Sequence, residues 1–141
     1  MDTMRTAKWN VYDQNCPTRL ALDRIADKWT VLIVGRLATG TKRFGELRRD
    51  ITGISPKVLT QKLRELERDG VITRKIYASV PPKVEYNLTP LGKTLINLLD
   101  SIRVWAESHI EYLLEAQAEY DQRLQEYPSL DGSSDDVETK N

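Results

Sequence analysis

The chain has 141 residues, of which 40% are apolar and 30% charged, and its 21 basic and 21 acidic side chains give a formal net charge of zero. This length and balance predict one ordinary soluble domain with a small core. No run of 18 apolar residues could cross a membrane and the first residues lack the apolar stretch of a secretory signal, so a cytoplasmic protein with no membrane partner is expected.

The net charge conceals a strong separation of charges along the chain. Residues 42–83 hold 11 basic and 5 acidic side chains (+6), residues 100–127 hold 2 and 7 (−5), and residues 128–141 hold 1 and 4 (−3). A phosphate backbone responds to the local field rather than to the total. The middle third of the chain is therefore the part expected to meet nucleic acid.

The first third of the chain predicts an arm followed by helices. Residues 1–15 are polar with isolated aromatic side chains, which is typical of an arm. Apolar residues recur at helical spacing over 17–26 and 44–51. The segment 29–37, WTVLIVGRL, is almost wholly apolar and is expected to form the centre of the core, with a turn after it at 38–41.

The next segment predicts a helix-turn-helix. Thr52-Gly53-Ile54 is a short turn containing glycine, and Ser55-Pro56 supplies an N-cap followed by proline at the first helical position. Leu59, Leu63 and Leu66 form the stripe that this helix would bury, and Gly70 would end it. Basic and polar side chains lie on the opposite face.

A hairpin and a long helix complete the prediction. Residues 71–77 and 84–88 alternate between apolar and polar, as the strands of a hairpin do, with its tip at 80–83. Apolar residues then recur in a heptad-like seam from Leu91 to Tyr112, predicting one helix from Leu91 to about Tyr120. Such a helix would span about 45 Å, so part of it is expected to pack on a second subunit. Residues 121–141 are predicted to be an acidic, disordered tail.

The helix from Ser55 is the first candidate for reading DNA, because an α-helix fits the major groove and Arg, Gln, Lys and Thr reach base edges and phosphates there. Gln61 and Arg64 are the predicted base contacts. The hairpin would act as a wing on the DNA backbone. The full set of candidate contacts is Arg48, Arg49, Ser55, Lys57, Thr60, Gln61, Arg64, Arg74, Lys75 and Lys83.

The order of these pieces resembles the HxlR-type family of bacterial winged-helix regulators. The resemblance covers about Cys16 to His109 and lies in the motifs CP, KWT, RFGELRR, GISPKVLTQKLRELE and VPPKVEYNLTPLG. It implies a mostly α protein with a β-hairpin wing, a winged helix-turn-helix domain over residues 16–120. It also implies a homodimer formed through the N- and C-terminal helices, which binds a pseudo-palindromic operator in double-stranded DNA.

Cys16 is the candidate sensor. Pro17 is suited to the first position of a helix, which would place Cys16 at or near an N-cap, where a thiol pKa falls; Arg19 or Lys8 could lower it further. Taken alone, the sequence favours a small buried apolar residue at Cys16 over a sensor. The resemblance implies a redox or electrophile switch, reacting with a quinone, aldehyde, peroxide or low-molecular-weight thiol. Since Cys16 is the chain's one cysteine, its oxidised product would be an intersubunit disulfide, a mixed disulfide or an adduct.

Two other functions fit the same residues. A small ligand between subunits could control the regulator, with Trp9, Trp29, Trp105 and Tyr112 lining its pocket. Alternatively, the domain could bind an acidic protein partner through the same basic surface. No cofactor or metal is expected, because one Cys and one His cannot complete the usual four-ligand zinc site, and no enzyme is expected, because His109 has no orienting group for a Cys16 nucleophile.

Overall fold

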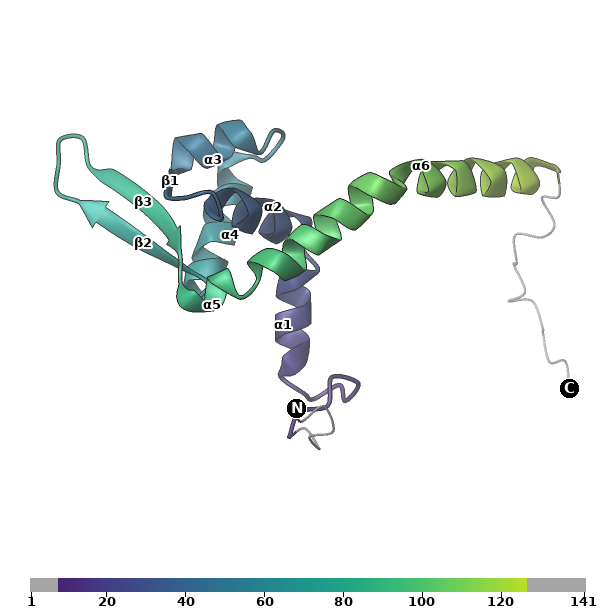
Figure 1. Cartoon of the computed structure of the whole chain (residues 1–141), viewed down its shortest axis with the longest axis horizontal. Helices are drawn as coiled ribbons and strands as arrows, with labels where there is room; N and C mark the ends of the chain where they lie inside the picture. The colour runs from purple at the N-terminus through teal and green to yellow at the C-terminus, as the bar shows by residue number, and fades with distance from the viewer. Residues whose placement is uncertain (1–7, 127–141) are drawn as a thin grey trace, which may run out of the picture. The chain divides into compact units, whose positions relative to one another are not determined.

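The structure is a computed structural model that describes residues 8–126, and it divides into two compact units, Met1–Arg103 and Val104–Asn141. Its elements are, in chain order, α1 (Thr18–Ile25), α2 (Lys28–Leu37), β1 (Lys42–Arg43), α3 (Phe44–Asp50), α4 (Pro56–Arg68), β2 (Ile72–Tyr77), β3 (Lys83–Leu88), α5 (Pro90–Lys93) and α6 (Ile96–Glu126) (Figure 1). The predicted class, mostly helical with a small β wing, is confirmed. Within the described range, no helix is both long and apolar enough to cross a membrane.

The wing is a three-stranded antiparallel sheet in the order β1-β3-β2, so the predicted hairpin has a third, short strand beside it. β1 pairs with β3 through Lys42 opposite Tyr86 and Arg43 opposite Glu85. The two residues of β1 are too short to show a strand period in the sequence. Figure 1 shows β2 and β3 extending beyond the helices of the first unit.

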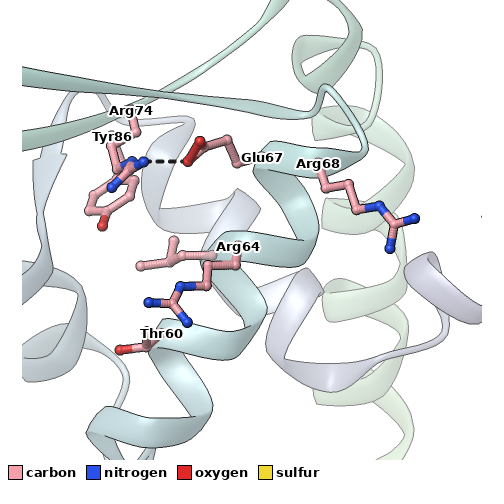
Figure 2. Close-up of a pocket in the computed structure, with 7 residues that line it drawn as sticks. Thr60, Arg64, Glu67, Arg68, Arg74 and Tyr86 are labelled. Atoms are coloured by element: carbon pink, nitrogen blue, oxygen red, sulfur yellow. Dashed lines mark ion pairs between the residues drawn. The ribbon is translucent and has the colours of Figure 1, made fainter.

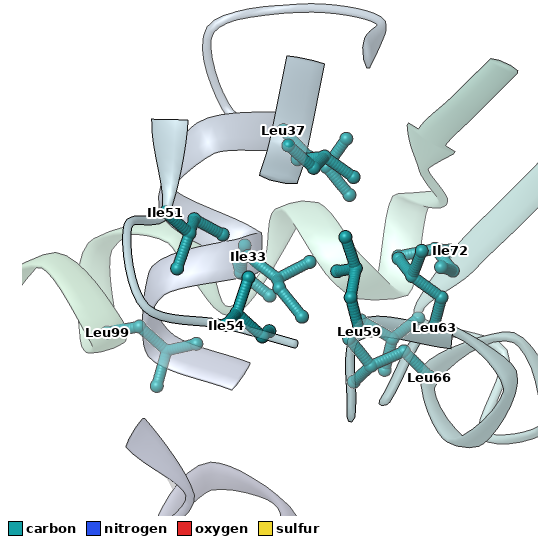
Figure 3. Packing of buried hydrophobic residues seen from close by; sticks show 12 residues of the cluster. Ile33, Leu37, Ile51, Ile54, Leu59, Leu63, Leu66, Ile72 and Leu99 are labelled. Carbon is teal, nitrogen blue, oxygen red and sulfur yellow. The ribbon is translucent and has the colours of Figure 1, made fainter. Parts of the chain in front are cut away.

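The core lies between α2 and α4. The buried stripe predicted for α4, Leu59, Leu63 and Leu66, is at most 2% exposed, and Ile33 and Val34 of α2 are fully buried against the same cluster (Figure 3). Burying a leucine side chain stabilises a fold by roughly 1.5–3 kcal/mol. The apolar stripe therefore fixes which side of α4 faces inward.

Local chemistry sets both ends of α4 as predicted. The Ser55 hydroxyl accepts a hydrogen bond from the Val58 N–H at 3.1 Å, and Pro56 occupies the first turn. Gly53 in the preceding turn and Gly70 after the helix have φ of 87° and 75°, a region that favours glycine. The turn before α4 and the two ends of α4 are therefore encoded by neighbouring residues.

The prediction of one C-terminal helix from Leu91 is wrong, because the structure divides this segment into α5 and α6. At the division, the Leu91 carbonyl accepts hydrogen bonds from both the backbone N–H and the hydroxyl of Thr94. The N–H of Leu95 then bonds to the Gly92 carbonyl rather than to Leu91, as it would in a continuous α-helix. The heptad seam from Leu91 is thus not continuous on one helix. Leu99, outside that seam, is buried in the core, and Ile96 at the start of α6 packs against it.

The ends of the chain also differ from the predicted division. α6 continues six residues past the predicted end at Tyr120, so residues 121–126 are helical rather than part of a disordered tail. Gln122 donates to Glu126 one turn later at 3.3 Å, which supports this last turn. In the predicted arm, residues 8–15 form turns held by α1: Arg19 donates to the carbonyls of Val11 and Tyr12. Residues 1–7 and 127–141 lie outside the described residues.

Gly92 allows α5 to pack directly on the backbone before the wing. Thr89 caps α5 through the Gly92 N–H at 3.0 Å, and its own N–H donates to the Val71 carbonyl at 3.0 Å. A Cβ added to Gly92 would lie 2.1 Å from that carbonyl oxygen. Through this contact, the segment that joins β3 to α5 packs against Val71, which follows α4. The space at residue 92 admits only a residue without a side chain.

Gly92→Ala is expected to lower the free energy of unfolding by about 3 kcal/mol, because the clash is with backbone and cannot be relieved by a rotamer change. Urea unfolding measures the effect. Gly35→Ala is the matched control: no atom lies within 4 Å of its added Cβ, so this helical substitution should stabilise the protein by about 0.5–1 kcal/mol. Equal stability of Gly92→Ala and wild type would contradict this packing.

Candidate functional site

The outward face of α4 carries most of the predicted DNA contacts. Thr60, Arg64 and Arg68 follow one another at four-residue spacing and lie between two surface hollows of about 530 and 600 Å³. Lys57 and Gln61 line the larger one. The structure thus brings together Lys57, Gln61, Arg64 and Arg68, which the sequence placed on one helix face, and places Thr60 beside them.

Two of the predicted contacts make hydrogen bonds within the protein. The Gln61 amide donates one hydrogen to Glu65 at 3.4 Å, and its second hydrogen and its oxygen remain for a base. The Ser55 hydroxyl accepts from Val58 as the N-cap and keeps its own proton available to a phosphate. Arg64 is exposed and makes no ion pair with any residue between 8 and 126.

One flank of α4 is tied to α1 and α2 by ion pairs. Arg24 of α1 pairs with Asp69 and, at 3.0 Å, with Glu65. Lys62 pairs with Asp27, the N-cap of α2. Burial acts most strongly on Asp27 and would raise its pKa, but the bonds from Lys62 and the Trp29 backbone outweigh it, so the Asp27 pKa lies below its usual value. These cations hold the helix in place and are not available to DNA.

The opposite flank of α4 meets the base of the wing. Arg74 of β2 forms an ion pair with Glu67 of α4, with Nε 3.0 Å from the carboxylate oxygen, and Tyr86 of β3 lies directly opposite Arg74 in the sheet (Figure 2). Both line the smaller hollow together with Thr60 and Arg64. Arg68 also lines this hollow, and Figure 2 shows its side chain directed away from Tyr86.

The structure separates the two cations predicted on β2. Successive residues of a strand point to opposite faces of a sheet. Arg74 faces α4, whereas Lys75 lies on the other face beside Glu85, its cross-strand partner, and its ammonium is 4.9 Å from the centre of the Tyr77 ring. Arg74 therefore shares a surface with Arg64, and Lys75 does not.

The remaining predicted cations lie apart from this surface. Arg48 and Arg49 are exposed in the last turn of α3. Lys83 begins β3 and lines a separate hollow at the wing tip, together with Arg43. Arg43 was missed because β1 was not predicted, although its charge was visible in the sequence.

Glu67 and Tyr86 were missed for a different reason. The sequence places Tyr86 on a strand and Glu67 on the helix, but only the hairpin register and the packing of β2 on α4 bring them together with Arg74. An acidic side chain is also a poor signal for a DNA surface. No feature of the sequence alone pointed to these two residues.

Cys16 lies two residues before α1 and is 9% exposed, with Pro17 as the N-cap rather than the first helical residue. Its sulfur is 3.0 Å from the Thr18 hydroxyl. The Thr18 side chain, then the Thr18 backbone and the Asn10 backbone, stabilise the thiolate and hold the Cys16 pKa below its usual value, against burial and Asp13. The predicted lowering is thus present, but it comes from hydrogen bonds rather than from Arg19 or Lys8.

The four aromatic residues suggested for a ligand pocket do not line the apolar hollow next to α1. That hollow, of about 400 Å³, lies between α1 and α5 and is lined by Pro17, Leu20, Ala21, Arg24, Ile25, Asp69, Val71, Leu91 and Leu95. Trp29 packs against the core, and Trp105 stacks on His109 with ring centres 4.8 Å apart. Among residues 8–126, no cluster of three or more His, Cys, Asp or Glu could hold a metal ion.

Comparison with known proteins identifies similar regulators. The profile of the HxlR-like helix-turn-helix family matches residues 24–113. The chain is 41% identical over 110 residues to the uncharacterized HTH-type transcriptional regulator YtfH of Escherichia coli, covering 78% of this chain and 87% of that protein. The redox regulator HypR in its reduced form is 41% identical, with a TM-score of 0.64 over 70% of this chain and 98% of HypR. Diamide-treated YodB from B. subtilis is 33% identical, with a TM-score of 0.57 over 68% of this chain and 96% of YodB.

Thr18→Val is expected to raise the pKa of Cys16, because it removes the hydroxyl that stabilises the thiolate while keeping the β-branched shape. The rate of alkylation by iodoacetamide, measured against pH, reports the thiolate fraction. The wild-type midpoint should lie below the value of about 8.5 for a free cysteine, and the variant's midpoint should lie above the wild-type one. Thr39→Val, which removes a hydroxyl bonded to Arg36 in another loop, should leave it unchanged. Identical profiles for wild type and Thr18→Val would exclude this role.

Proposed function

This chain belongs to the HxlR-like helix-turn-helix family of transcriptional regulators, and we propose that it binds a pseudo-palindromic DNA operator as a homodimer under the control of Cys16. The observation that carries the DNA-binding surface is the row of Lys57, Thr60, Gln61 and Arg64 on the outward face of α4. Each subunit would insert this face into one major groove, with the two half-sites roughly 34–36 Å apart. Arg74 would contact the backbone beside it.

Exposed apolar side chains support a dimer. Leu20 and Leu22 of α1 and Leu98 and Ile102 of α6 are each more than 40% exposed, and further large apolar residues are exposed along α6. Large apolar side chains exposed in such number are typical of surfaces that contact another protein. A second copy of the chain would cover it and would set the distance between the two α4 helices.

Three observations support Cys16 as the sensor. Its pKa is lowered by Thr18, it lies at the start of α1, and two similar structures are of a protein named as a redox regulator and of YodB treated with the thiol oxidant diamide. In an oxidised dimer, two Cys16 thiols would lose two electrons and two protons to diamide, form one disulfide and leave the reduced hydrazine.

The ion pairs of α1 offer a physical route from this reaction to DNA. Cys16 precedes α1 by two residues, and Arg24 in the last turn of α1 pairs with Glu65 and Asp69 of α4. A shift of α1 that broke these pairs would change the position of the reading helix. A coupling free energy of about 1–3 kcal/mol is typical for such a device.

Arg64→Ala is expected to weaken binding to an operator selected from a pool of random duplexes by about 1–3 kcal/mol, because it removes a base contact. Discrimination against base changes at one operator position should relax at the same time. Arg123→Ala, on the acidic part of α6, should leave the affinity unchanged. Unchanged affinity for Arg64→Ala would remove this residue from the reading surface.

Cys16→Ser is expected to bind the operator like wild type but to ignore diamide, because this variant has no thiol. Wild-type affinity should change on diamide treatment and recover with a reducing agent. Electrophoresis without reductant distinguishes an intersubunit disulfide from a mixed disulfide. Wild-type binding that is unaffected by diamide would eliminate the sensor and favour control by a non-reactive ligand.

A further inference from the structure

The hollow between α4 and the wing base combines three cations, two hydroxyls and one acid. Thr60, Arg64 and Arg68 line it from α4, Arg74 and Tyr86 line it from the wing, and Glu67 of α4 pairs with Arg74 across it (Figure 2). Its opening of about 530 Å³ is large enough for a phosphate group. The acid is unexpected on a surface that meets DNA, because a carboxylate repels phosphate.

Glu67 restrains Arg74 through a single atom. The Nε of Arg74 lies 3.0 Å from a Glu67 carboxylate oxygen in an ion pair, so the two terminal amino groups of the guanidinium are not the atoms in this contact, and the arginine side chain is 47% exposed. An arginine side chain loses rotamer entropy when it is fixed, and a side chain that is already held loses less on binding. An exposed ion pair adds little to folding stability, so the effect of this one is expected in binding.

Tyr86 offers a second donor at the same place. It lies opposite Arg74 in the register of β2 and β3, so both side chains are on the sheet face toward α4. Burial raises the pKa of Tyr86, which keeps the phenol protonated at neutral pH. Within the described residues, no hydrogen bond occupies its hydroxyl.

We propose that this hollow seats one phosphate of the DNA backbone, contacted by Arg74 and Tyr86, and that Glu67 is a positioning residue that holds Arg74 for this contact. The proposal rests on the DNA-binding function given above and adds two residues to it. The terminal amino groups of Arg74 would bind one or two phosphate oxygens, and the Tyr86 hydroxyl would donate to another. Because phosphates are the same in every duplex, this contact adds affinity without sequence preference.

A comparison of Glu67→Gln with Glu67→Ala distinguishes the positioning of Arg74 by residue 67 from the repulsion of phosphate by the Glu67 carboxylate. Both remove the negative charge, but only glutamine keeps an oxygen that accepts from Arg74. With a labelled duplex of mixed sequence and about 30 base pairs, Glu67→Ala is expected to bind about fivefold more weakly than Glu67→Gln, the effect of one lost hydrogen bond. In an Arg74→Gln background, this difference should disappear.

The slope of log K against log salt separates the two contacting residues. Arg74→Gln should weaken binding and reduce the slope by about one for each subunit. Tyr86→Phe should weaken binding about fivefold without changing the slope, because it removes a donor but no charge. Inorganic phosphate added at constant ionic strength tests whether the hollow prefers the free ion.

Equal affinities of Glu67→Gln and Glu67→Ala, or a difference that persists with Arg74→Gln, would overturn the positioning role. Wild-type affinity for Tyr86→Phe would remove the tyrosine from the contact. Variants that lose binding of inorganic phosphate while keeping wild-type DNA affinity would assign the hollow to the free ion instead.

The wild-type protein distinguishes failure of the proposed function from failure of this inference. If the wild type shows no salt-dependent binding to any duplex, the proposed function fails. If the wild type binds and only the Glu67 comparison fails, the error is confined to this inference.

Discussion

The position of α4 is the constraint on which the rest of the structure depends. Its apolar stripe, Leu59, Leu63 and Leu66, is buried against α2 and fixes the rotation of the helix about its axis. Ion pairs then fix its two flanks, to α1 and α2 through Arg24 and Lys62, and to the wing through Glu67. What remains is one outward face, which carries the exposed Lys57 and Arg64. The basic field of a neutral protein is thereby concentrated where a helix can enter a groove.

The charged side chains of α4 therefore fall into two groups. Those on its flanks are paired within the protein, and those on its outward face are directed to solvent. The helical period places Lys62 and Arg64 on different sides of the helix, but it does not show that Lys62 pairs with Asp27, a residue far away in the sequence. The ion pairs of Arg24 with Glu65 and Asp69 also connect α1 to α4. A regulatory change at Cys16, which precedes α1, would need such a connection to affect α4.

Features set by neighbouring residues could be predicted from the sequence. The cap at Ser55, the glycine turn and the buried stripe of α4 are all local, and the structure contains each of them. Which of the two β2 cations faces α4 could not be predicted, because the choice between Arg74 and Lys75 follows from packing of β2 on α4. The division between α5 and α6 was missed although it is local, because it follows from the bonds that Thr94 makes to Leu91 in place of the regular helical pattern. β1 was missed because its two residues have no recognisable period.

The salt dependence of DNA binding tests the central claim most directly. If the outward face of α4 and the base of the wing bind phosphates, log K for a mixed-sequence duplex must fall linearly with log salt concentration, with a slope of about −0.9 for each phosphate neutralised. A dimer that uses several cations in each subunit predicts a slope of roughly −5 or steeper. No binding at low salt, or an affinity that is independent of salt, would contradict the account.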